Sequence, residues 1–214
     1  TQLSVVYLLA IYMCDKLGTL SKKDYEGYIS ELQRLPDKIE EALKNRETAK
    51  QLAARFYGAE DIYFIGRNLD YAMSLEGSLK LKEISYIRSE AYAAGELKHG
   101  TISLIEEGTL VVALATQPRL FDKMMSNVKE VKSRGAVVIG LTTKNNTKIE
   151  KETDYHFYIP EGDTLFVCAF LAQSCLLANN NRRNEIFYHC QNPHSCRSSF
   201  RGQCCCCAGS RLHH

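Results

Sequence analysis

The sequence predicts an α/β protein whose parallel β-sheet is covered by helices on both faces and is preceded by a helical arm. Two observations predict this class. Four short and largely apolar runs have the length of strands, at residues 61–66, 109–116, 136–143 and 154–160. Stretches with helical periodicity separate these runs along most of the chain. Strands that are apolar on both faces and alternate with helices are typical of parallel sheets.

The first helices form the arm. Residues 1–17 contain a mostly apolar run and predict a helix that ends near Gly18. A second helix is expected from Ser21, a residue type that caps helix N-termini, and Pro36 interrupts its pattern before it continues to about residue 43. Within the α/β part, further helices are expected at residues 46–57, 70–87, 119–134 and 164–178.

The apolar N-terminal stretch does not predict a membrane span. It is apolar for only about a dozen residues and has no basic segment before it, whereas a span needs about 20 apolar residues. We therefore expect a buried or interface helix, no targeting segment and a cytoplasmic location. The chain does not begin with Met, which is consistent with a fragment or a processed form.

Charge and cysteine content separate a nearly neutral body from an unusual C-terminal end. The formal charge of the chain is +2, which argues against a dedicated nucleic-acid-binding protein. Residues 179–214 hold five Arg, one Glu and no Lys. Cys14 is the only cysteine before residue 168. A cysteine content this low in residues 1–167 is typical of a reduced, cytosolic protein. The C-terminal end contains residue types that bind zinc, but their spacing matches no familiar zinc site: His189, Cys190, His194 and Cys196. We therefore expect no metal and no cofactor.

The charged segment from residue 75 to residue 100 stands out among apolar neighbours. Glu76, Lys80 and Glu83 follow one another at i, i+4 and i+7, so they share one face of the expected helix. Charge runs of this kind are usually solvated faces with weak salt bridges. Leu75, Leu79 and Ile84 flank the three charges, which favours instead a face that is closed off from water.

His99 is the second candidate feature. It lies between Lys98 and Gly100 in an expected loop, where apolar packing does not explain it. The pKa of histidine is close to neutral pH, so a loop histidine is a candidate for proton transfer. The alternative is an exposed surface histidine without a role.

The run "LEGSLKLKEISYIRSEAYAAGELKHG" closely resembles the second sugar-isomerase (SIS) domain of the glutamine–fructose-6-phosphate aminotransferase family. The resemblance covers about residues 1–170 and includes "TQLSVVYLLA" and "YFIGRN". It implies a three-layer, flavodoxin/Rossmann-like SIS fold. It also implies an enzyme that makes glucosamine 6-phosphate and glutamate from fructose 6-phosphate and glutamine, with an amidohydrolase domain and two SIS domains.

The resemblance implies roles for three residues. Glu83 matches the base that moves a proton between C1 and C2 of the sugar, and Lys80 matches a lysine of the same site. His99 matches the histidine that assists ring opening and reaches the site of the neighbouring subunit of a homodimer. Interconversion of a ketose and an aldose needs such a carboxylate and a second acid or base.

The chain also departs from the family. The resemblance implies a helical arm at 1–45 after a first SIS domain, a second SIS domain at 46–178, and an atypical cysteine-rich tail at 179–214 outside the fold. The lysine that forms an imine with the sugar has no counterpart in the tail. We therefore expect the chain by itself to be inactive. A non-catalytic phosphosugar-binding or dimerisation module stays open as the alternative function.

Overall fold

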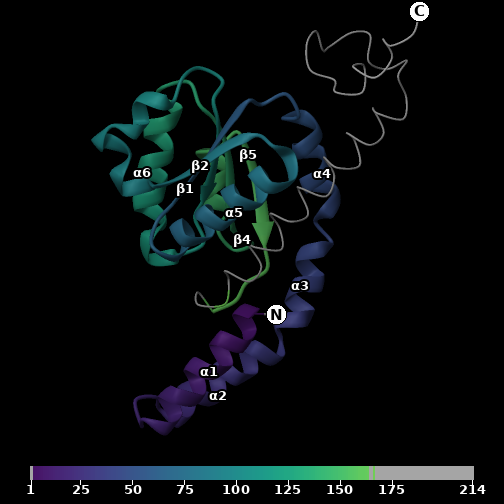
Figure 1. Cartoon of the computed structure of the whole chain (residues 1–214), viewed down its shortest axis with the longest axis vertical. Helices are drawn as coiled ribbons and strands as arrows, with labels where there is room; N and C mark the ends of the chain where they lie inside the picture. The colour runs from purple at the N-terminus through teal and green to yellow at the C-terminus, as the bar shows by residue number, and fades with distance from the viewer. Residues whose placement is uncertain (1, 164–165, 167–214) are drawn as a thin grey trace, which may run out of the picture.

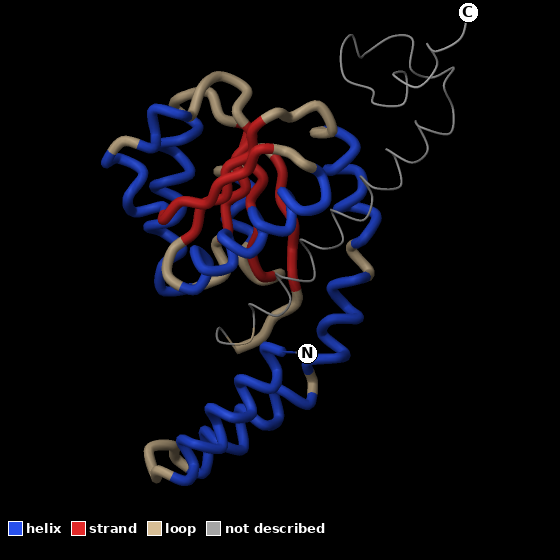
Figure 2. The backbone as a smooth tube through the Cα atoms, viewed as in Figure 1, coloured by secondary structure: helices blue, strands red, loops and turns tan. Residues whose placement is uncertain are grey.

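A computed structural model of the chain describes residues 2–163 and residue 166, and the helix expected at 164–178 lies outside these residues apart from Phe166. Five parallel strands form one sheet in the order β2-β1-β3-β4-β5 (Figures 1 and 2). The strands are β1 (Asp61–Gly66), β2 (Arg88–Ala93), β3 (Leu110–Leu114), β4 (Val137–Thr143) and β5 (Tyr155–Ile159). The predicted α/β class with a parallel sheet is confirmed.

Helices connect the strands and form the arm. The α-helices are α1 (Gln2–Lys16), α2 (Lys22–Gln33), α3 (Leu35–Leu43), α4 (Arg46–Arg55), α5 (Leu69–Ser85) and α6 (Phe121–Lys132). Four 3₁₀ helices lie between strands: η1 (Ala94–His99), η2 (Thr101–Leu104), η3 (Pro118–Leu120) and η4 (Thr147–Lys151). Ser21 caps α2 as expected, since its side chain accepts a hydrogen bond from the Asp24 N–H at 3.1 Å.

Strand β2 was missed by the sequence prediction, which expected four strands. Its sequence RSEAYA carries charge at alternate positions, and Arg88 and Glu90 are exposed. The reason is its place at the edge of the sheet, where it pairs only with β1. An edge strand needs no continuous apolar run, because one side of its backbone and part of its surface face water.

The sheet has a core on each face. On one face, Met124, Val128 and Val131 of α6 pack against β3 and β4 and are at most 1% exposed. On the other face, α5 covers β1 and β2, and α3 and α4 contribute Leu35, Ala49 and Leu52 to the same cluster. This second face carries the helix on which the predicted site residues lie.

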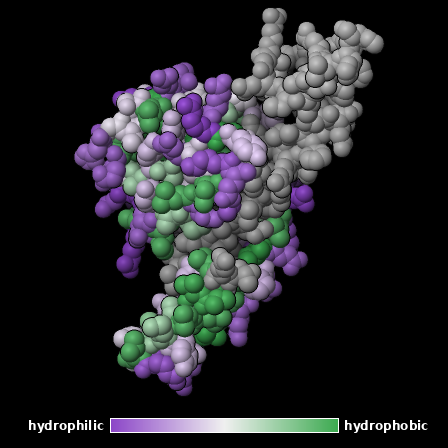
Figure 3. Space-filling model, in the orientation of Figure 1, coloured by the Kyte–Doolittle hydropathy of each residue, from purple (hydrophilic) through white to green (hydrophobic). Residues whose placement is uncertain are grey.

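The arm is a hairpin of α1 and α2 that projects from the α/β body (Figure 1). On the face seen in Figure 3, apolar residues (green) gather along the arm, with hydrophilic residues at its lower tip. Among the large side chains of α1, Val5, Val6, Leu9 and Tyr12 are more than half exposed, and Ile11 is buried. No helix within the described residues is long and apolar enough to cross a membrane.

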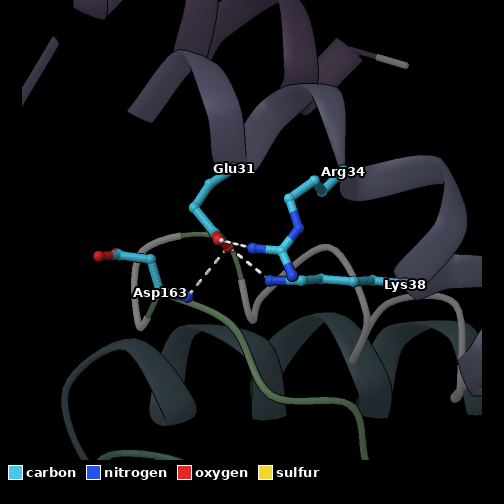
Figure 4. A network of polar contacts seen from close by, with 4 residues as sticks. All are labelled: Glu31, Arg34, Lys38 and Asp163. Atoms are coloured by element: carbon cyan, nitrogen blue, oxygen red, sulfur yellow. Dashed lines mark hydrogen bonds and ion pairs between the residues drawn. The ribbon is translucent and has the colours of Figure 1, made fainter. Parts of the chain in front are cut away.

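A polar contact joins the arm to the segment that follows β5 (Figure 4). The Glu31 carboxylate of α2 accepts hydrogen bonds from the Lys38 ammonium at 2.5 Å and the Arg34 guanidinium at 3.3 Å. It also accepts a longer one, 3.5 Å, from the backbone N–H of Asp163. The hydrogen bond from Lys38 is the main reason that the pKa of Glu31 is lowered.

Candidate functional site

Helix α5 starts directly after β1, and one glycine sets how closely it approaches the strand. A Cβ atom on Gly66 would lie 2.5 Å from the carbonyl carbon and oxygen of Asp70 in the first turn of α5. Asn68, just before the helix, has φ +53° and ψ −121°, a conformation that residues other than glycine rarely adopt. The turn from strand to helix is therefore tight.

Small residues hold α5 against the sheet. Ser74, Gly77 and Ser78 are buried on the face that meets β1 and β2. The Ser78 hydroxyl accepts a hydrogen bond from the Ser89 hydroxyl of β2 at 3.0 Å, and the Ser74 hydroxyl donates one to the Asp70 carbonyl at 2.7 Å. Glu76, Lys80 and Glu83 lie on the opposite side of the helix, whereas Met73 and Leu81 pack against the core of this sheet face.

The predicted charges form one cluster on the outer face of α5. The Lys80 ammonium lies 2.9 Å from a Glu83 carboxylate oxygen and 3.7 Å from one of Glu76. The hydrogen bond to Glu83 is the main reason that the pKa of Lys80 is raised. The structure thus brings Lys80 and Glu83 together.

The expectation that these charges are closed off from water is wrong for the chain by itself. The side chain of Glu83 is 49% exposed and that of Lys80 is 28% exposed. Leu75 and Leu79, which suggested burial, are themselves 48% and 45% exposed. Their apolar character was misleading because other residues of α5, among them Ser74, Ser78 and Leu81, face the sheet. The side chain of Ile84 lies outside the described part of the structure.

His99 lies at the end of η1, in the connection that follows β2. Its side chain is 77% exposed, and its Nε2 atom lies 3.7 Å from the Glu96 carboxylate. Among the described residues, neither Lys80 nor Glu83 forms a hydrogen bond or ion pair with His99. The structure therefore does not join His99 to the α5 cluster within one chain.

A buried polar clamp at the carboxyl end of the sheet was not predicted from the sequence. Asp70 is 3% exposed and accepts two hydrogen bonds from Thr116, one from its N–H at 2.9 Å and one from its hydroxyl at 2.5 Å. Beside it, the Gln117 side-chain amide donates to the Arg67 carbonyl at 3.0 Å. The clamp ties the start of α5 to the end of β3. In the sequence, these residues are marked only by their positions shortly after the strands β1 and β3.

We expect Asp70→Ala to lower the free energy of unfolding by roughly 2–3 kcal/mol, because it leaves the Thr116 N–H buried without an acceptor. Burial raises the pKa of Asp70, and the hydrogen bonds from Thr116 oppose that shift. Urea denaturation followed by circular dichroism measures the loss. Asp15→Ala, at an exposed position of α1, is the control and is expected to change stability by less than about 0.5 kcal/mol. Equal effects of the two variants would show that the clamp contributes nothing.

No metal-binding cluster is present among the described residues, where no three His, Cys, Asp or Glu side chains gather. The histidines and cysteines of the C-terminal end lie outside this part of the chain. The carboxyl edge of β3 and β4 borders a pocket of about 440 Å³ that also contains Arg34 and Lys38. Glu31 pairs with both cations, so they do not form a free anion site.

The family follows from comparison with known proteins. A model of the SIS domain matches residues 55–178 of the chain, which is more than half of its length. The chain therefore belongs to the SIS-domain family, and the fold and the helix α5 described above are those of a SIS domain.

Curated relatives of high identity are named glutamine–fructose-6-phosphate aminotransferase. The chain is 53% identical over 161 residues to the enzyme of Caldanaerobacter subterraneus, an alignment that covers 75% of this chain and 26% of the relative. It is 42% identical over 187 residues to the enzyme of Methanosarcina acetivorans, covering 84% of this chain and 30% of that one. The chain thus spans about a quarter to a third of the length of these relatives.

Solved structures agree with this family. The C-terminal domain of glucosamine-fructose-6-phosphate aminotransferase from Francisella tularensis has a TM-score of 0.77 and 30% identity, covering 82% of this chain and 50% of that chain. A putative sugar-phosphate isomerase from Listeria monocytogenes has a TM-score of 0.56 at 15% identity, covering 81% of this chain and 99% of that chain. The second likeness shows the fold alone.

Proposed function

We propose that this chain is the second SIS domain, with its preceding helical arm, of a glutamine–fructose-6-phosphate aminotransferase that acts in the cytoplasm. The single observation that carries the proposal is the Lys80–Glu83 pair on the outer face of α5, in a chain 53% identical to an enzyme of that name. In this proposal the substrate of the domain is fructose 6-phosphate, and the amino sugar phosphate is formed only in the longer protein.

The chemistry of isomerisation fits these residue types. Glu83 acts as the base that moves a proton between C1 and C2 of the open sugar. Lys80 stays protonated, since its pKa is raised by Glu83, and stabilises the negative charge that develops on the sugar oxygen. Proton abstraction from carbon proceeds best where bulk water is excluded. The exposed face of α5 therefore needs a cover, which we assign to the first SIS domain of the longer protein.

The test uses the chain and a chimera. The purified chain is expected to form no glucosamine 6-phosphate from fructose 6-phosphate and ammonium, because the rest of the site is absent. A chimera in which residues 2–163 replace the matching segment of the Caldanaerobacter enzyme is expected to form it. Both are measured by mass spectrometry of the sugar phosphates. Product from the chain alone, or a folded chimera without activity, would contradict the proposal. The second outcome would favour a non-catalytic SIS module.

The proposal includes a two-fold homodimer in which His99 assists ring opening in the partner's site. Two observations support it: His99 is exposed and separate from Lys80 and Glu83 within one chain, and α1 exposes several large apolar side chains. A two-fold interface would create two composite sites from one self-complementary surface.

Sedimentation at micromolar concentration is expected to give a dimer of the chain. The double variant Val6→Lys with Leu9→Lys, which puts two charges on the exposed face of α1, is expected to raise the dissociation constant at least about 100-fold. Thr48→Lys, at an exposed position of α4, adds charge without touching the apolar face and is the control. A monomeric wild-type chain would exclude the dimer through this helix.

A further inference from the structure

The 3₁₀ helix η1, which ends at His99, has three faces. Because a 3₁₀ helix has three residues per turn, side chains three positions apart share a face. Ala94 and Leu97 form one face and are 0% exposed, in the core cluster that α6 covers. Glu96 and His99 form another face, and their side chains are 74% and 77% exposed. The direction of the His99 side chain therefore depends on what holds the third face.

Polar groups hold this third face, which Gly95 and Lys98 form. A Cβ atom on Gly95 would lie 3.1 Å from one Nη atom of Arg67 and 3.4 Å from its Cζ atom. The Arg67 guanidinium group therefore lies directly against the backbone of η1. One turn further along the same face, the Lys98 ammonium lies 2.9 Å from a carboxylate oxygen of Glu130 in α6.

One buried side chain connects Arg67 with Glu130. Asn127 of α6 is 5% exposed, and its Oδ1 atom accepts a hydrogen bond from the Arg67 Nε–H at 3.0 Å. The Nδ2 atom of Asn127 donates a hydrogen bond to the Glu130 carboxylate at 3.3 Å. A buried amide that loses a hydrogen-bond partner costs free energy, so these contacts keep the guanidinium group in its place against η1.

The backbone of Arg67 belongs to the turn between β1 and α5. Its carbonyl oxygen accepts hydrogen bonds from the Asp70 N–H at 3.1 Å and from the Gln117 side-chain amide at 3.0 Å. Through its main chain, Arg67 thus contacts the start of α5, and through its side chain it contacts η1. These two helices carry all three residues of the proposed site.

We propose that Arg67 is a positioning residue that holds η1, and with it His99, in a fixed place on the α/β body. Its importance for ring opening rests on the function proposed for His99. An acid or base acts only within hydrogen-bond reach of the atom it serves, and a displacement of about 1 Å can cost about 100-fold in rate. Arg67 needs no contact with the substrate, because it acts through the backbone of η1.

Hydrogen exchange in the full chain tests this role without an assay of activity. Arg67→Met keeps the length of the side chain and removes the guanidinium group. We expect the backbone amides of residues 94–99 to exchange at least about tenfold faster than in the wild type, because η1 opens locally more often. Lys129→Met is the matched control, since it removes a cation whose contact, with Glu152 at 3.0 Å, lies elsewhere on α6. Equal rates in the wild type and Arg67→Met, or an equal increase in Lys129→Met, would overturn the proposal.

Kinetics in the chimera with the Caldanaerobacter enzyme tests whether Arg67 acts through His99. Arg67→Met is expected to lower kcat at least about tenfold, with KM within about twofold of the parent and the chimera still folded at the assay temperature. Arg67→Met combined with His99→Asn should be no more than about twofold slower than His99→Asn alone, since both changes affect one group. Losses that multiply in the double variant would overturn the action through His99.

The failure of this proposal can be distinguished from the failure of the proposed function. A folded parent chimera without activity would contradict the proposed function, and the exchange rate of residues 94–99 would still decide whether Arg67 holds η1. An active parent chimera that loses activity on His99→Asn but not on Arg67→Met would overturn the positioning role of Arg67 and leave the proposed function intact.

Discussion

Glu83→Gln is expected to lower kcat for glucosamine 6-phosphate formation by about 10²–10⁴-fold in the chimera with the Caldanaerobacter enzyme, as removal of a general base does. Glutamine keeps the size of the side chain and can still accept a hydrogen bond from Lys80, which lies 2.9 Å from Glu83. It has no basic carboxylate, so the proton on the sugar carbon has no acceptor. Steady-state kinetics with fructose 6-phosphate measures the loss, and an unchanged melting temperature shows that the fold is intact.

Two further variants make this result specific. Glu76→Gln removes the other carboxylate near Lys80, at 3.7 Å and one turn away. Because that contact is a partly exposed ion pair, its removal is expected to cost less than about tenfold in kcat. Glu47→Gln, at an exposed position of α4, should have no effect. A larger loss of kcat in Glu76→Gln than in Glu83→Gln would indicate that Glu76, and not Glu83, is the base.

Gly66→Ala is expected to lower the free energy of unfolding by about 3 kcal/mol, at the upper end of overpacking effects. The added methyl group would lie 2.5 Å from the backbone of Asp70, and backbone atoms cannot move aside as a flexible side chain does. Either α5 shifts away from β1 or the Asp70–Thr116 clamp is distorted. Urea denaturation measures the loss.

The matched control for this variant is Gly27→Ala in α2, where an added Cβ meets nothing within 4 Å. It is expected to stabilise the chain by about 0.5–1 kcal/mol, since alanine favours a helix interior over glycine. The two substitutions add the same methyl group and should have opposite signs. A Gly66→Ala chain as stable as the wild type would show that α5 adjusts without cost, and would contradict the tight turn after β1.

The sequence by itself determined the elements whose signal is local. Strand β1 was predicted with its observed bounds, and the central strands β3 and β4 were found because burial on both faces requires a continuous apolar run. The cap of α2 at Ser21 and the end of the first helix near Gly18, which has φ +65°, follow from single residue types. The pairing of Lys80 with Glu83 on one helical face follows from their spacing.

Only the tertiary structure decided the features that depend on which surfaces meet. Strand β2 is polar at alternate positions because it ends the sheet, and its sequence gives no apolar run to detect. Leu75 and Leu79 are exposed although they are apolar, because the face of α5 that meets the sheet contains Ser74, Gly77 and Ser78 instead. The Asp70–Thr116 clamp joins residues 46 positions apart. Neither burial nor such a contact is a property of a residue type, since both arise only when distant segments of the chain pack together.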